Sequence, residues 1–386
     1  MSRMKPIWRA ALFFLPLVVV FGTPAIVLSL GGEFAAPELV ATEQSRTREL
    51  VLFGRAYTNP ILPLKWQRVV EQPPEVLALG TSRVLQFRAE FFRPNVKFYN
   101  FGGCIGRIEH LRIILEKLPA RALPKTLLLA ADPNFFQSPY AGPGHTRHVE
   151  WIDQRLADRP RMWQTYETHW QHVWGDIFAG KIAFRRLAGG EGLRSRFGLN
   201  ALCNEQGFRN DGSYLYGRNY LDITSAHHPD HLFKGTLKLI DKGSFHFAWA
   251  KVPSAPALDE LRRLLGFCNA RGIDVIGFLP PYPHAVWAKM KSSGEKYSYL
   301  EPLPALLGTA FAERGFEFYD FSDFEMLGAA DSEAIDGLHG SERVYLRLLI
   351  AMIERGSRLN AYTSLPELRA ALAASKTHTS LFPERL

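Results

Sequence analysis

The sequence predicts an α/β protein with a doubly wound parallel sheet, preceded by one apolar helix. Short apolar runs, such as residues 76–79 and 126–131, are typical of buried strands, and they alternate with longer stretches of helical periodicity. This alternation is typical of parallel strands joined by right-handed helical crossovers. With 386 residues, of which 47% are hydrophobic and 22% charged, the chain is long enough to bury a large core.

We expect the elements of this core in a fixed order along the chain. The predicted strands are at residues 76–79, 96–101, 126–131, 274–279 and 316–321. The helices between them include residues 108–117, 258–271 and 303–314. A last helix is predicted at residues 341–354, and Ser341 is its expected N-cap.

Residues 1–31 predict a cytoplasmic tip and a transmembrane anchor. Residues 10–30 carry no charge and are long enough to cross a bilayer as a helix, which Pro16 and Pro24 are expected to kink. Three basic residues precede this run: Arg3, Lys5 and Arg9. The positive-inside rule therefore predicts a single-pass protein of the inner membrane whose main domain lies in the periplasm. A cleaved signal peptide is the alternative, although no small-residue cleavage site follows the run.

Beyond the anchor, we expect a stalk at residues 32–74, an α/β domain at 75–358 and a C-terminal tail at 359–386. Residues 135–256, between the third and fourth strands, are too long for a plain loop and are expected to form a cap. Four aromatic residues in the cap follow a spacing of three and four: Trp163, Tyr166, Trp170 and Trp174. This spacing predicts one helical face, which either packs the cap onto the sheet or stacks on sugars.

Two short motifs carry candidate catalytic residues. Gly80-Thr81-Ser82-Arg83 directly follows the first predicted strand, which places the Ser82 hydroxyl where ligands bind in open α/β sheets. Asp336-Gly337-Leu338-His339 places a carboxylate three residues before a histidine, so a single helical turn brings both side chains to one face. Together the motifs supply a nucleophile, a base and a carboxylate that orients the base. Taken alone, Ser82 also fits a helix N-cap, and Asp336-Gly337 an ordinary turn.

These motifs resemble those of the SGNH (GDSL-like) serine hydrolase superfamily, in which the first block ends in the nucleophile and a last block reads Asp-x-x-His. The Gly-Thr-Ser-Arg form is similar to its membrane-anchored branch, which includes periplasmic proteins of exopolysaccharide O-acetylation and a protein that assists D-alanylation of teichoic acids. The resemblance implies Ser82, His339 and Asp336 as the triad and a flavodoxin-like strand order. It covers roughly residues 75–140 and 255–355.

The resemblance also implies oxyanion donors from two middle blocks of the sequence. In the second block, either Gly106 or Gly103 is expected to supply a backbone N–H. The third block calls for an asparagine just after a strand, where this chain has Asp132, with Asn134 two residues later. An ionised Asp132 does not donate a hydrogen bond, so the identity of the third-block donor stays open.

Further expectations concern the substrate and its surroundings. Arg83 is expected either to hold an anionic group of the substrate or to pair with a core acid such as Asp132. A polar loop at residues 207–214 is similar to one in the same branch and is expected at the substrate rim. The net charge of +8 suits an anionic or acylated glycan, or is no more than a solvated surface, and export excludes nucleic acid as a partner.

No cofactor or metal is expected from the sequence. It has neither a Walker loop nor a dinucleotide-binding fingerprint. Histidines cluster at residues 227–231 and at His145 and His148, but Pro229 breaks the helical spacing that a zinc motif requires. The three cysteines lie far apart and predict no disulfide framework.

The resemblance thus implies a membrane-anchored serine acyl-transfer enzyme, an O-acetyltransferase or O-acetylesterase that acts on an envelope or exported polysaccharide. Transfer and hydrolysis share an acyl-serine intermediate and differ in whether a sugar hydroxyl or water accepts the acyl group, so both stay open. A multispanning membrane protein that delivers the acyl group is the expected partner. The alternative is a catalytically silent SGNH-fold component that binds glycan or assembles with polysaccharide export or modification machinery. Asp132 at the third block favours it, as does the shifted glycine of the second block, where the family spacing falls on Ile105.

Overall fold

The computed structural model describes residues 6–137, 145–159 and 161–382. The chain divides into two compact units. Unit 1 comprises Met1–Pro60 and Asp158–Asn210, and unit 2 comprises Ile61–Ala157 and Asp211–Leu386. Each unit is therefore assembled from segments that lie far apart in the sequence.

Unit 2 holds a parallel sheet of five strands in the order β3-β2-β4-β8-β9. These are β2 (Val76–Leu79), β3 (Phe98–Asn100), β4 (Thr126–Ala130), β8 (Asp274–Leu279) and β9 (Glu317–Asp320). Each neighbouring pair is parallel, which confirms the predicted parallel sheet. Counted along the chain, the order is 2-1-3-4-5, as in flavodoxin-like sheets, and the carboxyl ends of all five strands lie at one edge.

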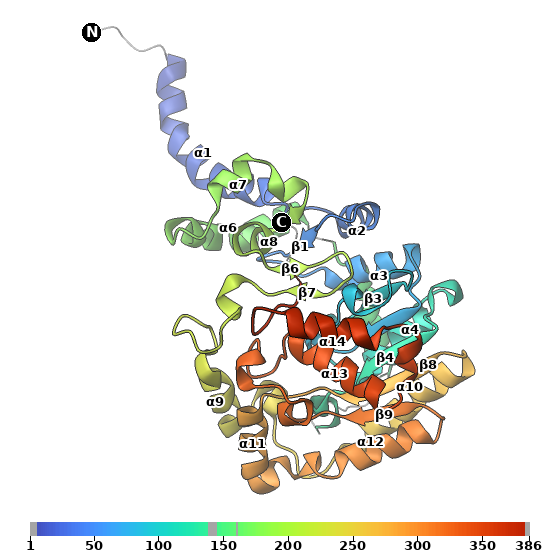
Figure 1. Cartoon of the computed structure of the whole chain (residues 1–386). Helices are drawn as coiled ribbons and strands as arrows, with labels where there is room; N and C mark the ends of the chain where they lie inside the picture. Colours follow the sequence, from blue (N-terminus) through green and yellow to red (C-terminus); the bar gives the residue numbers. More distant parts are fainter. Residues whose placement is uncertain (1–5, 138–144, 160, 383–386) are drawn as a thin grey trace. The chain divides into compact units, whose positions relative to one another are not determined.

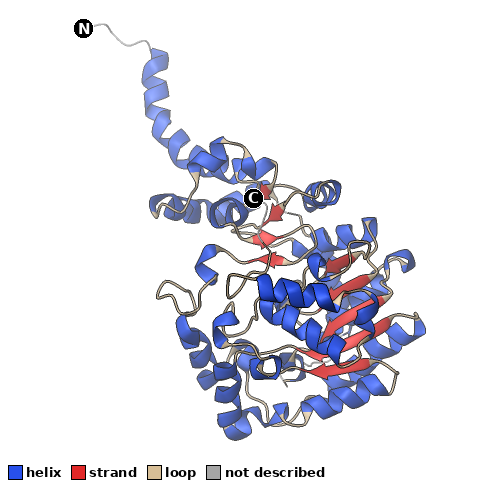
Figure 2. Ribbon diagram, in the orientation of Figure 1, coloured by secondary structure: helices blue, strands red, loops and turns tan. Residues whose placement is uncertain are grey.

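Helices cover both faces of this sheet (Figure 2). Strands β2 and β4 are buried along their whole length, as expected for parallel strands between two helical layers. In one layer three helices contact one another in turn: α4 (Ile108–Lys117), α10 (Ala255–Ala270) and α12 (Leu303–Ala312). A second pair of contacting helices is α13 (Glu342–Glu354) and α14 (Leu365–Ala374). Unit 2 also contains α3 (Ile61–Glu71), α5 (His145–Leu156), β7 (Tyr214–Leu215), α9 (Lys234–Lys242) and α11 (His284–Ser292).

The predicted N-cap of α13 is wrong in its mechanism. Ser341 does precede the helix with an extended backbone, but its side chain makes no capping hydrogen bond. The residue is completely buried, and its hydroxyl has no partner among the described residues. The backbone N–H of Ser341 donates to the carbonyl of Glu333 instead, so the preceding loop fixes the start of α13.

Unit 1 combines the N-terminal apolar helix with the middle of the segment that was expected to form the cap (Figure 1). Its helices are α1 (Pro6–Leu30), α2 (Pro37–Arg46), α6 (Met162–Phe178), α7 (Phe184–Ala188) and α8 (Leu199–Asn204). A short strand, β1 (Leu52–Phe53), pairs with β5 (Arg196–Phe197) and β6 (Gly207–Phe208). These pairings join the expected stalk to the expected cap, so the structure has different boundaries from those predicted: α3 and the expected tail belong to unit 2.

The aromatic face of α6 contacts α1 rather than the sheet. The ring of Trp170 lies 5.3 Å from that of Phe21, and Tyr166 and Trp174 hydrogen-bond to the α1 backbone. The prediction that this face packs onto the sheet is therefore wrong, because the partner is an apolar helix of the same unit. Helix α1 is long and apolar enough to cross a membrane, by length and composition only. Arg3 and Lys5 lie outside the described residues.

Candidate active site

Three residues predicted from the sequence meet at the carboxyl edge of the parallel sheet. The Ser82 hydroxyl oxygen lies 2.7 Å from Nε2 of His339. On the other side of the ring, Nδ1 of His339 lies 2.9 Å from both carboxylate oxygens of Asp336. A serine, a histidine and an aspartate thus form a continuous chain of hydrogen bonds, the geometry in which an imidazole can accept the serine proton.

The turn after β2 leaves the Ser82 hydroxyl available to the histidine. A Cβ atom at Gly80 would lie 2.8 Å from Cγ1 of Val84 and 2.9 Å from Cβ of Ala130, so only glycine fits this close turn. The residue that caps the short helix at Ser82–Val84 is Thr81, whose side-chain oxygen accepts the N–H of Arg83. The alternative role of Ser82 as the N-cap therefore does not apply.

The turn that carries the histidine is shaped by the Asp336 carboxylate. Its Oδ1 atom accepts the backbone N–H groups of Leu338 and His339, each at 2.8 Å. Burial raises the pKa of Asp336, but the neighbouring His339 and these hydrogen bonds lower it further than burial raises it, so the pKa lies below its usual value. An ionised Asp336 is what an imidazolium at His339 requires as a counter-charge.

A second aspartate and a histidine fix this turn from outside, and the sequence did not identify their role. Oδ2 of Asp230 accepts the N–H of Gly337 at 3.1 Å. Nδ1 of His228 accepts the N–H of Asp230, so its Nε2 carries a proton and donates to the Ile335 carbonyl at 2.9 Å. A Cβ atom at Gly337 would lie 2.4 Å from Oγ1 of Thr236, which makes glycine necessary here. The cluster at residues 227–231 thus positions the turn that carries Asp336 and His339.

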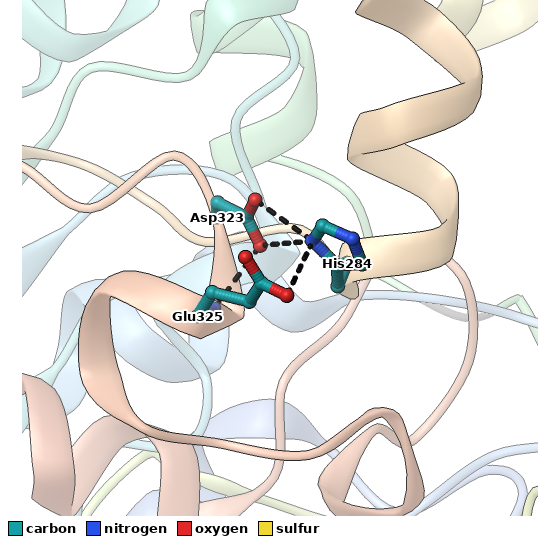
Figure 3. A group of neighbouring side chains, drawn as sticks. All are labelled: His284, Asp323 and Glu325. Atoms are coloured by element: carbon teal, nitrogen blue, oxygen red, sulfur yellow. Dashed lines mark hydrogen bonds and ion pairs between the residues drawn. The ribbon is translucent and has the colours of Figure 1, made fainter.

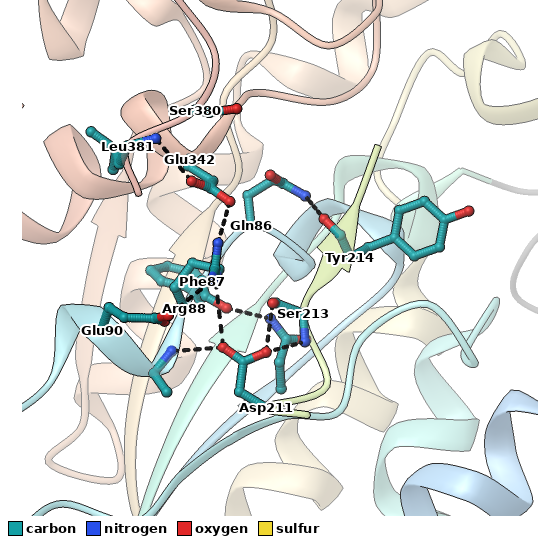
Figure 4. Close-up of polar contacts among 12 residues, drawn as sticks. Gln86, Phe87, Arg88, Glu90, Asp211, Ser213, Tyr214, Glu342, Ser380 and Leu381 are labelled. Atoms are coloured by element: carbon teal, nitrogen blue, oxygen red, sulfur yellow. Dashed lines mark hydrogen bonds and ion pairs between the residues drawn. The ribbon is translucent and has the colours of Figure 1, made fainter. Parts of the chain in front are cut away.

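A charged network links the segments that follow Ser82 and His339 (Figure 4). Arg88, six residues after Ser82, forms a 2.6 Å ion pair with Glu342, which lies at the start of α13 just after His339. Asp211 accepts the N–H of Ala89 at 2.8 Å and lies 3.6 Å from Arg88. The side chain of Gln86 donates to the carbonyl of Tyr214 at 2.8 Å. Residues 211–214 of the expected rim loop therefore brace the nucleophile segment.

Asp132 and Arg83 form a buried pair and do not face a substrate. Their exposed fractions are 0% and 2%, and the carboxylate lies 3.3 Å from the guanidinium. Asp132 also accepts the Thr81 hydroxyl at 2.5 Å, while Arg83 donates to the Pro280 carbonyl and lies 3.8 Å above the Tyr282 ring. Asp132 is thus excluded as an oxyanion donor, and of the two roles considered for Arg83, pairing with a core acid is confirmed.

The candidate oxyanion donors differ in whether their N–H groups are already bound. Gly103 donates its N–H to the Thr81 carbonyl at 3.1 Å, so this group is engaged. Within the described part of the chain, the backbone N–H groups of Ser82 and Gly106 have no acceptor. Nδ2 of Asn134 lies 3.1 Å from Nδ1 of His246, and because an amide nitrogen only donates, His246 is the acceptor. Of the candidates from the two middle blocks, Gly106 and Asn134 therefore retain donor capacity, and the backbone N–H of Ser82 is a third such donor.

Two residues near the triad were missed in the sequence. His246 reaches the solvent, yet desolvation of its ring lowers its pKa; Asp132 opposes this shift, and His339 adds to it. His246 is thus close enough to the triad for the charge of His339 to affect its pKa. Because that pKa is lowered, His246 is mainly neutral near pH 7. The ring of Tyr216 lies 5.9 Å from that of His339. Neither residue stands in a recognisable motif, so no local signal could have identified them.

Two further groups of side chains include histidines. His148 of α5 contacts His110 of α4, with 3.3 Å between their ring nitrogens, and His110 stacks on Trp151. The side chain of His145 is outside the described residues. Figure 3 shows His284 with Asp323 and Glu325, whose potential ligand atoms lie within 4.8 Å of one another. Two of these three residues are partly exposed and one is fully exposed, and their contacts are accounted for as ion pairs.

The site thus combines a serine that can act as a nucleophile, a histidine that can act as its base, an ionised carboxylate and N–H groups with donor capacity at one edge of the sheet. Among the described residues the three cysteines are free, so no disulfide contributes to it. No protein-family model matches the chain, and no curated protein matches it significantly.

Proposed function

We propose that this chain is a membrane-anchored serine acyl-transfer enzyme of the SGNH type, an O-acetyltransferase or O-acetylesterase that acts on an envelope or exported polysaccharide. The observation that carries the proposal is the hydrogen-bonded series from Ser82 through His339 to Asp336. A serine hydroxyl is a weak nucleophile at its ordinary pKa, and this series is the arrangement that activates it.

The proposed reaction begins when Nε2 of His339 takes the proton from Ser82 as its oxygen attacks the ester carbonyl of an O-acyl group. The carbonyl oxygen becomes an oxyanion, which the N–H groups of Ser82 and Gly106 and the Asn134 amide are proposed to hold. Collapse of this intermediate breaks the ester bond, and the imidazolium returns the proton to the leaving oxygen, which belongs to the glycan in hydrolysis and to the acyl donor in transfer. A sugar hydroxyl or water then attacks the acyl-serine, with His339 as base, and regenerates Ser82.

The substrate class follows from charge and location. A chain with a net charge of +8 suits an anionic or acylated glycan. The apolar length of α1 supports an anchor in the inner membrane with the main domain in the periplasm, where such glycans are exported. In the transferase case, a multispanning membrane protein would deliver the acyl group.

A serine-directed fluorophosphonate probe tests the chemistry directly. We expect the full-length wild-type protein to be labelled, Ser82→Ala to be unlabelled, and His339→Ala to be labelled far more slowly. Ser292→Ala, which changes an exposed serine on α11, is the matched control and should react like the wild type. Equal labelling of wild type and Ser82→Ala would refute Ser82 as the nucleophile.

One observation favours the second candidate, a catalytically silent glycan-binding or assembly component. At the third block the residue after the strand is Asp132, whose carboxylate is bound by Thr81 and Arg83, so it supplies no donor. This candidate predicts that Ser82→Ala supports normal polymer production and acylation while deletion of the protein does not. The acyl-transfer proposal predicts loss of acyl groups from the polymer in both strains.

A further inference from the structure

Helix α6 supplies a hydrogen bond that α1 lacks. In an α-helix the carbonyl of Val20 pairs with the N–H four residues later, but that residue is Pro24, which has no N–H. Nε1 of Trp174 donates to this carbonyl at 2.8 Å, and the Tyr166 hydroxyl donates to the neighbouring Phe21 carbonyl at 2.8 Å. An unpaired carbonyl costs several kcal/mol in hydrocarbon. The hydrogen bonds from the aromatic face of α6 therefore fix its position along α1 at Val20 and Phe21.

The part of α1 that precedes Val20 and Phe21 is too short to cross a bilayer alone. The uncharged run begins at Ala10, and from Ala10 to Phe21 a helix rises about 17 Å, against a hydrocarbon thickness of about 30 Å. From Phe13 to Phe21 the side chains of α1 are all exposed, whereas Val27 and Leu28 are buried in the core of unit 1. If α1 is the proposed anchor, the outer part of the hydrocarbon surrounds its contact with α6.

An apolar groove of about 640 Å³ lies at this contact, a size typical of small-molecule sites. Val18, Phe21 and Ala25 of α1 line one side, and Met162, Trp163 and Trp170 of α6 line the other. Met162 is 60% exposed and Trp163 is 70% exposed, so large apolar groups lie at the opening of the groove. Gln164, Thr168 and His169 of α6 instead line a separate polar pocket. Helix α6 therefore has an apolar side toward α1 and a polar side, as interfacial helices do.

We propose that α6 lies in the outer interface of the bilayer that α1 crosses, and that the groove between them holds an acyl chain of a membrane phospholipid. The proposal rests on the membrane anchoring proposed above and is independent of the acyl-transfer chemistry. The identity of the occupant follows from the comparison of helix length with bilayer thickness. If α1 crosses the bilayer, the groove beside Phe21 opens into the hydrocarbon, so an acyl chain is the molecule available to fill it. Trp and Tyr are the residues enriched at this depth.

The test uses the full-length protein in its native membranes with the photoreactive amino acid benzoylphenylalanine at single positions. One variant carries it at Trp163, at the opening of the groove. A second carries it at Phe13, which is 72% exposed on α1 and reports on the anchor alone. A matched control carries it at Thr168, which is exposed and lies five residues along α6, about 140° around the helix from Trp163. Mass spectrometry after irradiation identifies what each position has captured.

The proposal expects phospholipid adducts at positions 163 and 13 and at least tenfold fewer at position 168. Adducts at position 13 but not at 163 would refute the placement of α6 while the anchor stands. A protein adduct at 163 would show that the groove holds a partner helix or a second copy, which also refutes the proposal. No lipid adduct at either position would refute the anchor itself, and fluorophosphonate labelling of Ser82 would remain as an independent test of the chemistry.

Discussion

Two histidines at the carboxyl edge of the same sheet each turn Nδ1 toward an aspartate, at nearly equal distances. His339 lies 2.9 Å from Asp336, and His284 lies 3.0 Å from Asp323. The His339 side chain is 15% exposed and its second nitrogen meets Ser82, whereas His284 is 45% exposed and its neighbour is a second acid, Glu325. A carboxylate on Nδ1 is thus not enough to make a histidine a candidate catalytic base. The group that faces its Nε2 atom decides, and of these two histidines His339 is the one with a serine hydroxyl there.

The carboxylates also differ in how they are held. Asp336 accepts two backbone N–H groups of its own turn, each at 2.8 Å, whereas Asp323 accepts one, from Glu325 at 3.1 Å. At the second pair, the hydrogen bond with Asp323 raises the pKa of His284, so a larger fraction of its rings is protonated near pH 7. A protonated ring cannot accept a proton from a nucleophile. Substitutions at the His339–Asp336 pair should therefore affect turnover far more than substitutions at the His284–Asp323 pair.

Ser82→Ala should lower turnover of p-nitrophenyl acetate by about a millionfold, because it removes the nucleophile of the proposed triad. His339→Ala should cause a similar loss, and the double variant should be scarcely worse than either, since triad members act as one unit. Circular dichroism checks that each variant is folded. Additive losses in the double variant would contradict a shared mechanism.

Asp336→Asn should lower turnover by about a thousandfold to ten-thousandfold while substrate affinity changes little, since the amide neither holds the useful tautomer nor stabilises the imidazolium. Asp323→Asn is the matched change at the second pair and should leave turnover within twofold of wild type. Steady-state kinetics of both variants provides the comparison. Equal losses would mean that His284 takes part in the reaction.

Asn134→Asp should slow the acyl step by about a hundredfold, because the carboxylate keeps the shape of the amide but loses its donors. His246→Ala removes the hydrogen-bond partner of Asn134 and should cost less than tenfold if Asn134 acts directly on the oxyanion. Pre-steady-state bursts measure the acyl step for both. A larger loss for His246→Ala would assign the main role to that histidine.

Asp132→Asn should act on stability rather than on chemistry. It leaves the buried guanidinium of Arg83 without a counter-charge, and breaking a buried pair costs about 3–5 kcal/mol of unfolding free energy. Turnover per folded molecule should be retained, since Asp132 has no free face toward the site. Urea denaturation read alongside turnover distinguishes this outcome from a catalytic role, which would reduce turnover at unchanged stability.

His284→Ala should have the smallest effect, and that effect should depend on pH. Because the folded state raises the pKa of His284, the stabilisation is fully present below about pH 6.5 and is lost as pH rises through the folded-state pKa. The melting temperature of the variant should therefore fall below that of wild type at pH 5.5 and approach it at pH 8. His227→Ala, at an exposed position, is the control and should show no such trend.

The sequence was sufficient for features whose determinants are local. The strand at Val76–Leu79 is an uninterrupted apolar run closed by a glycine that the turn requires, and Ser82 follows it within three residues. Order along the chain then placed Ser82 and His339 at one edge. The parallel sheet was predictable for the same reason, because alternating elements admit few topologies.

Features that depend on distant contacts were not predictable. Strand β1 is two residues long, and its partners β5 and β6 lie more than a hundred positions later. No local sequence pattern therefore predicts how the chain divides into two units. The spacing of Trp170 and Trp174 predicted one face correctly, but spacing carries no information about which element covers it. His246 and Asp230 act from irregular segments, where neither periodicity nor motif marks a residue.

The distance along the chain between Ser82 and His339 has a consequence for when activity arises. The two residues are separated by 257 positions, and the ion pair of Arg88 with Glu342 spans 254. Ribosomes deliver the proposed nucleophile early and its proposed base late, so under the proposed function a nascent chain carries an inert serine for most of its synthesis. Under the proposed topology, completion of the fold coincides with arrival outside the cytoplasm. Cytosolic thioesters and esters would therefore never meet an assembled site, and no separate inhibitor would be needed to protect them.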